Sequence, residues 1–153
     1  MKLTDVIRRD HERFRTALEG ILRHAENDRE EAGRQFDELA RDIHAHHEGE
    51  EQVWLPRFDD DAEARAEALE YVEEHDVLQD LMEKLRGADP TNERWLPRLR
   101  VFREILLHHI DEEEDEGFAL ADELIEELEL ERLGAEFDQR TRDMLRRARS
   151  AEA

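Results

Sequence analysis

The feature that most restricts the fold of this chain is a series of apolar residues spaced three and four apart, in which polar residues occupy some of the positions. It is clearest between Phe36 and Val53, where His46 and Glu50 occupy two positions of the apolar series. Residues three and four apart share one face of an α-helix. This segment therefore predicts an amphipathic helix that carries an imidazole and a carboxylate on its buried face.

The same spacing recurs along the chain and predicts five helices, whereas no segment alternates apolar and polar residues as a half-buried strand does. Pro56 and the turn residues between Gly87 and Asn92 mark breaks between helices. We expect an all-α fold, namely an up-down-up-down four-helix bundle with a short C-terminal fifth helix against its end. The expected helices cover residues 4–25, 28–54, 62–86, 93–128 and 130–149.

Composition limits the partners and the compartment. The formal charge is −21, from 44 acidic and 23 basic residues, which argues against nucleic acid and membranes as partners. The absence of cysteine excludes disulfides and metal sites built from thiolates. No apolar run approaches the roughly 20 residues of a membrane span, and none forms a signal peptide. We therefore expect one cytoplasmic domain over residues 1–153, with its core bundle at about 4–128; no protein partner is indicated.

A histidine lies on the apolar stripe of each predicted bundle helix, which directs four imidazoles towards one central volume. These histidines are His11, His46, His75 and His109. Glu50 and Glu113 follow two of them by one helical turn on the same face. Buried charges without partners cost many kcal/mol, and metal ions would turn these groups into ligands. Histidine with carboxylate suits iron, manganese or zinc rather than calcium. Two ions bridged by both glutamates use all of these donors, and we favour two iron ions.

Spacing by itself does not select the ligands, because six of the eight histidines have an acidic residue four positions later. Helical phase turns His24 and His44 away from the stripes. His47 with Glu51, and His108 with Glu112, form a coherent second choice of register. A single histidine on an apolar face can also be a hydrogen-bonded core residue without a metal.

These motifs resemble the hemerythrin-like, or HHE cation-binding, family, and the resemblance covers nearly the whole chain. The matching segments are Asp10-His11, His46-x-x-x-Glu50-Glu51-x-x-Trp54-Leu55-Pro56, Glu74-His75 and His109-Ile110-x-x-Glu113-Glu114-x-x-x-Phe118. The resemblance implies a four-helix bundle with two iron ions in a non-haem di-iron centre, bridged by the two carboxylates and an oxo or hydroxo group. It also implies a small diatomic or peroxide ligand, for oxygen binding, sensing or storage.

The chain departs from the oxygen-carrying pattern of that family at one position. Oxygen carriers have a second third-helix histidine one turn before the first, and this chain has Tyr71 there. Tyr71 is either an additional metal ligand through its phenolate or a core residue with a hydrogen-bonded hydroxyl. The missing imidazole favours the alternative of a di-iron enzyme that consumes peroxide or nitric oxide. A metal-free helical interaction module is a further alternative. A ferritin-like centre is disfavoured because no histidine has a glutamate three residues before it.

Overall fold

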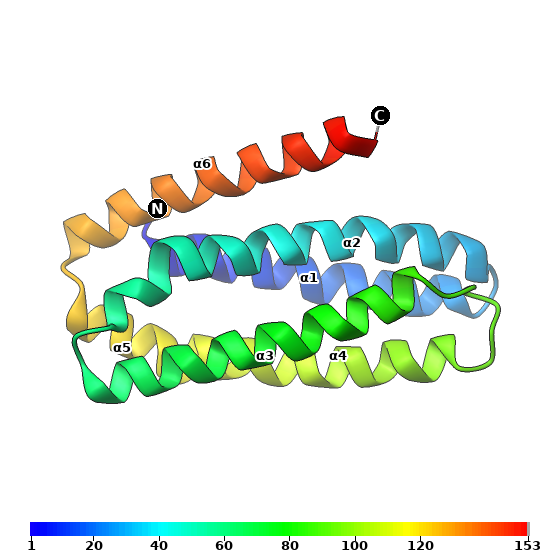
Figure 1. The fold of residues 1–153 in the computed structure, drawn as a ribbon, viewed down its shortest axis with the longest axis horizontal. Coiled ribbons are helices and arrows are strands. Elements are labelled where there is room, and N and C mark those ends of the chain that lie inside the picture. The colour runs from blue at the N-terminus through cyan, green and yellow to red at the C-terminus, as the bar shows by residue number, and fades with distance from the viewer. Residues whose placement is uncertain (153) are drawn as a thin grey trace.

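The computed structural model describes residues 1–152, and these residues form helices without any strand. Four long helices run antiparallel to their neighbours in the chain and make an up-down-up-down bundle (Figure 1). They are α1 (Leu3–Ala25), α2 (Arg29–Gly49), α3 (Ala62–Arg86) and α4 (Trp95–Glu112). The all-α bundle expected from the apolar spacing is confirmed. Within residues 1–152 no helix has the length and apolar character that crossing a membrane requires.

Two short π-helices interrupt the long helices that the sequence predicts as continuous. The first, η1 (Glu50–Trp54), follows α2 and leads into the 3₁₀-helix η2 (Leu55–Phe58). The second, η3 (Glu113–Gly117), follows α4 and leads into α5 (Phe118–Leu124). π-Helical turns of this kind are rare and occur frequently at functional sites. The sequence predicts that the fourth helix continues to residue 128, and this is wrong. Ile125 adopts an extended backbone and ends α5.

Aspartate caps fix the starts of the two helices that follow tight connections. Asp28 accepts a hydrogen bond from the backbone N–H of Glu31 at 3.1 Å, at the start of α2. Asp61 accepts one from the N–H of Ala64 at 3.0 Å, at the start of α3. Each such cap stabilises a helix by about 1 kcal/mol. The caps therefore set where α2 and α3 begin and, with them, the phase of their buried faces.

The C-terminal helix α6 (Glu127–Glu152) is longer than predicted and does not lie across the bundle end. It runs beside α1 and α2 over much of their length (Figure 1). Leu130, Leu133 and Phe137 are buried on its inner face. The close approach to α2 requires a glycine, since a Cβ atom on Gly49 would lie 2.8 Å from Phe137 Cε2. Packing against a bundle face rather than a bundle end gives α6 more apolar surface to bury.

Two apolar clusters fill the bundle, one at each end. The turn-end cluster lies by the α1–α2 and α3–α4 connections and includes Phe14, Leu18, Phe36, Ile43, Leu78, Trp95 and Phe102. The α6-end cluster includes Leu3, Ile7, Trp54, Phe58, Tyr71, Phe118 and Phe137. On α1 the α6-end cluster stops at Ile7 and the turn-end cluster starts at Phe14, with His11 between them. The two clusters therefore enclose a polar layer from both sides.

Candidate metal centre

The polar layer consists of seven side chains that are each at most 5% exposed. They are His11, His46, His47, Glu50, His75, His109 and Glu113. Charged or ionisable side chains are seldom buried to this degree unless they are paired or bind metal. Every helix of the four-helix bundle contributes, either directly or through the π-helical turn that follows it. The layer is therefore a shared product of the whole bundle.

These side chains form two overlapping groups whose possible ligand atoms lie within 4.8 Å of one another. The first group contains His11, His46, Glu50 and Glu113. The second group contains His47, Glu50, His75 and His109. Glu50 belongs to both. Each group has the number and type of donors that a divalent transition metal ion takes from a protein.

The two inner carboxylates lie between the groups and offer one oxygen to each. Glu50 places Oε2 3.3 Å from Nε2 of His46 and Oε1 3.2 Å from Nε2 of His75. Glu113 places Oε1 3.2 Å from Nε2 of His11 and Oε2 3.1 Å from Nε2 of His109. An arrangement with one oxygen on each side is what a carboxylate that bridges two ions requires.

The inner atoms of the layer lack hydrogen-bond partners. Nε2 of four histidines and both oxygens of Glu50 and Glu113 are buried and, although they lie 3.1–3.3 Å from one another, are not aligned for a hydrogen bond. Buried polar atoms without partners are rare in folded proteins and costly. Since all of these atoms are metal-ligand types and converge on one volume, the residues fit a pair of metal ions.

A second set of carboxylates, here called the outer ring, accepts hydrogen bonds from Nδ1 of the same four imidazoles. In each case Nδ1–H of the histidine donates to a carboxylate oxygen of a neighbouring helix. The pairs are His46 with Asp10 (2.9 Å), His75 with Glu51 (2.7 Å), His109 with Glu74 (2.8 Å) and His11 with Glu114 (2.7 Å). Such bonds orient metal-binding imidazoles and make them more basic.

The outer ring closes on itself around the bundle. A carboxylate on each helix, or just after it, accepts a hydrogen bond from the histidine of the next helix along the chain. The carboxylate that follows α4 accepts one from the histidine of α1, which closes the ring. Each outer carboxylate is also adjacent in sequence to an inner residue, as Asp10 is to His11 and Glu51 is to Glu50. Each such pair of adjacent residues therefore supplies an inner ligand atom and a hydrogen bond to an imidazole of another helix.

Burial and the surrounding carboxylates act on the histidine pKa values in opposite directions. Burial lowers the pKa of His46, but the charge of Glu50 and the bond to Asp10 raise it to about 10. For His109 burial likewise lowers the pKa, while Glu113 and Glu74 raise it to about 9. In the absence of metal the carboxylates are therefore offset by imidazolium protons, which metal ions would replace.

His47 is the inner side chain that helical phase assigned only to the second-choice register. Its ring stacks on His75 with centroids 3.8 Å apart and lies 5.5 Å from that of His109. Burial and the neighbouring imidazoles His75 and His109 hold the pKa of His47 well below its usual value, so this ring is neutral and able to bind a metal ion. Its spacing of three from Glu50 is the sequence signal for this position, because residues three apart share a helix face.

The remaining candidates from the sequence lie outside both groups. Tyr71 is buried, but its hydroxyl donates to the backbone carbonyl of Glu112 at 3.3 Å. Burial and the charge of Glu67 raise the pKa of the Tyr71 phenol, which disfavours a phenolate. His24 and His44 are exposed, as their helical phase predicts. His108 is also exposed and pairs with Glu112 on the surface.

Comparison with known proteins adds to this geometry. A sequence model of the hemerythrin HHE cation-binding domain matches residues 2–121. A DNA nickase of Nostoc sp. is 27% identical over 119 residues, which cover 78% of this chain and 33% of that protein. An uncharacterized hemerythrin-like protein of Schizosaccharomyces pombe is 24% identical over 139 residues, which cover 90% of this chain and 68% of that protein. The chain thus spans about a third of the first relative. No solved structure matches the chain at the significance of these two relatives.

Proposed function

The chain belongs to the hemerythrin HHE cation-binding domain family, and on that premise we propose that it is a non-haem di-iron protein that binds O2 or a related small oxidant. The position of the two inner carboxylates carries this proposal. Glu50 and Glu113 each face both groups of imidazoles with separate oxygens, as bridging ligands between two ions do. Bound iron would supply the redox chemistry and the position at which a small oxidant binds.

The residues of the chain would hold the ions and control protons and water. His11 and His46 would bind one ion, and His47, His75 and His109 would bind the other. Glu50 and Glu113 would each offer one oxygen to each ion. The outer carboxylates keep a proton on Nδ1, so that Nε2 presents its lone pair to the layer. At His46 and His109, whose pKa values are raised in the metal-free chain, metal binding would displace the Nε2 proton and release it. The apolar clusters on either side limit the access of water.

Reversible binding of an oxidant is favoured over its consumption by the number of imidazoles. The sequence suggested a missing nitrogen donor, because Tyr71 stands where oxygen carriers of the family have a histidine. His47 brings the two groups to five imidazoles. The hydroxyl of Tyr71 is engaged with a backbone carbonyl, which argues against its use as a ligand. A di-iron enzyme that consumes peroxide or nitric oxide is the alternative.

Metal analysis and absorption spectroscopy of the full chain, expressed with iron, test the proposal. We expect both sites to contain iron, and an absorption change on adding O2 that reverses when O2 is removed. His46→Ala and His109→Ala should lose iron, whereas His24→Ala and His44→Ala, which change exposed residues, should retain it.

Other outcomes would assign other functions. Continuous turnover of hydrogen peroxide or nitric oxide without a reversible O2 spectrum would support the enzyme. Zinc or manganese in place of iron, after expression with all three metals, would contradict the di-iron proposal. A chain that purifies without metal and keeps its thermal stability in His46→Ala and His109→Ala would instead be a helical interaction module.

Action on DNA is not part of the proposed function. The Nostoc relative that is named a DNA nickase is matched over 33% of its length. The formal charge of −21 also opposes binding to a phosphate backbone. For both reasons the DNA activity named for that relative is not proposed for this chain.

A further inference from the structure

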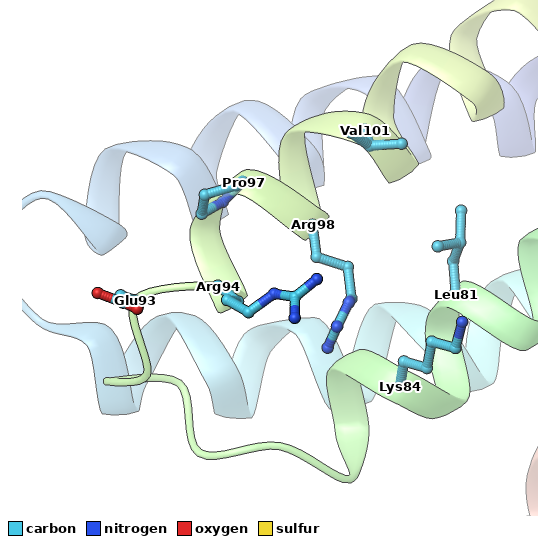
Figure 2. A pocket seen from close by; sticks show the side chains of 7 residues that line it. All are labelled: Leu81, Lys84, Glu93, Arg94, Pro97, Arg98 and Val101. Carbon is cyan, nitrogen blue, oxygen red and sulfur yellow. The ribbon is translucent and has the colours of Figure 1, made fainter.

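A hollow of about 550 Å³ lies between α3 and α4, away from the metal centre (Figure 2). It is formed by the last turns of α3, the turn before α4 and the first turns of α4. Its lining combines apolar and cationic side chains, with Leu81, Pro97 and Val101 of the first kind and Lys84, Arg94 and Arg98 of the second. The hollow is therefore separate from the candidate ligands, since His75 lies near the middle of α3 and His109 in the last turn of α4.

The three cations share the hollow with one carboxylate, that of Glu93. Within residues 1–152, none of them pairs with a carboxylate, whereas Arg15 and Arg132 elsewhere on the surface do. Glu93 also borders the hollow, but Figure 2 shows its carboxylate pointing away from the guanidinium groups of Arg94 and Arg98. Like charges that share a depression repel one another unless an anion lies between them. The hollow therefore gathers three cations without ion pairs in a chain with 44 acidic and 23 basic residues.

The arrangement of the side chains suits an anion that also has an apolar part. Figure 2 shows Arg94 and Arg98 extending from the α4 side towards α3, with Val101 directed towards Leu81. Guanidinium groups bind carboxylate and phosphate groups through paired hydrogen bonds. Val101 is 48% exposed and, with Leu81 and Pro97, gives the hollow an apolar wall that a ligand could cover. The volume lies in the range of about 300–1,000 Å³ that is typical of small-molecule sites.

We propose that this hollow binds a small organic anion, with a carboxylate or phosphate group joined to an apolar body. Arg94, Arg98 and Lys84 contact the charged group, and Leu81, Pro97 and Val101 contact the apolar body. An inorganic anion would leave the apolar wall uncovered. An anionic membrane is disfavoured because the rest of the chain is strongly acidic.

Calorimetric titration of the full chain with octyl phosphate, octanoate and inorganic phosphate tests this site. We expect one saturable site for the two octyl compounds and much weaker binding of inorganic phosphate. Arg94→Gln and Arg98→Gln should each weaken binding by about tenfold, the loss expected for one charge-assisted hydrogen bond. Arg100→Gln is the matched control, because Arg100 is exposed on α4 but does not line the hollow.

Further variants separate the charged contacts from the apolar ones. Val101→Ser should weaken binding of octyl phosphate but leave that of inorganic phosphate unchanged. Arg98→Lys keeps the charge and should restore part of the affinity lost in Arg98→Gln. Equal binding by all variants, or equal binding of inorganic and octyl phosphate, would overturn the proposal. Binding of an acidic peptide that octyl phosphate does not displace would overturn it as well, in favour of a protein-docking surface.

Discussion

Two segments of the bundle follow the same plan and differ at one position that is buried in both. Residues 46–51 join α2 to η1, and residues 109–114 join α4 to η3. In each segment a histidine begins the series, a glutamate starts the π-helix, and the next glutamate bonds a histidine of a neighbouring helix. The second position is His47 in one segment and Ile110 in the other, and both are buried. This single difference gives the second group its third imidazole.

The comparison shows that the two proposed ion sites are unequal. The first group has two imidazoles, whereas the second has three. Four of the histidines donate Nδ1–H to an outer carboxylate, but His47 has no such bond within residues 1–152. The second site should therefore be the richer in nitrogen donors and the more readily altered by substitution.

The largest effect is expected from the carboxylate that both groups share. Glu50→Gln keeps the size of the side chain but removes its negative charge, so both proposed ions should be lost. Iron content per chain measures this outcome. Glu48→Gln is the control on the same helix, since Glu48 belongs to neither group. Full iron content in Glu50→Gln would contradict the bridging role.

Making the two segments alike should affect one proposed ion. His47→Ile copies Ile110 and removes the third imidazole of the second group, so we expect about half of the iron to be lost, with the first group retained. Iron analysis together with the absorption spectrum measures this change. His44→Ala changes an exposed neighbour on α2 and should have no effect. If His47→Ile retains both ions, His47 is a packing residue rather than a ligand.

The metal-free chain should lose stability as the pH rises above neutral. The folded-state pKa values of His46 and His109 are raised to about 10 and about 9. A raised histidine pKa contributes stability that is complete below about pH 6.5 and is lost as the pH rises through the folded-state value. We expect the free energy of unfolding to fall by a few kcal/mol between about pH 6.5 and 10. Urea denaturation measures the slope, which His46→Gln should reduce.

His47 should respond to pH in the opposite direction. Its folded-state pKa lies well below the ordinary value, so protonation at low pH opposes folding. His47→Ile should therefore improve the stability of the metal-free chain below about pH 6.5, relative to wild type. Urea denaturation at pH 5.5 and pH 7.5 tests this expectation. An equal change at both pH values would mean that packing, not ionisation, decides the effect.

Smaller effects are expected in the outer ring. Glu51 and Glu114 occupy equivalent positions in the two segments and accept hydrogen bonds from His75 and His11. The variants Glu51→Gln and Glu114→Gln weaken these bonds. Loss of such a support weakens metal binding by about 10- to 100-fold. Competition with a metal chelator measures the affinity. Unequal losses would show that the supports of His75 and His11 are not equivalent in strength.

The smallest effect is expected at Tyr71. Tyr71→Phe removes a hydrogen bond to the carbonyl of Glu112, which should cost about 1 kcal/mol of unfolding free energy. Iron content and the absorption spectrum should not change, because the hydroxyl belongs to neither group. Loss of a charge-transfer band in Tyr71→Phe would instead identify the phenolate as a ligand.

The sequence by itself determined which face of each bundle helix is buried. Apolar residues at spacings of three and four specify one stripe, so a histidine or glutamate within the stripe must lie in the core. This reasoning placed His46, Glu50, His109 and Glu113 in the interior, and these residues are buried. It also predicted the all-α bundle, because the breaks at Pro56 and Gly87 leave segments of helical length.

Only the tertiary structure decided the features that depend on neighbouring helices. His47 lies about 100° from His46 around α2, at the edge of the stripe, so its burial depends on the position of α3. The outer ring joins residues up to 103 positions apart, and no local pattern specifies such pairs. The place of α6 depends on the close approach of Gly49 and Phe137, which lie on different helices and far apart in the sequence. Helical period is a local property, whereas these contacts arise from the packing of separate helices.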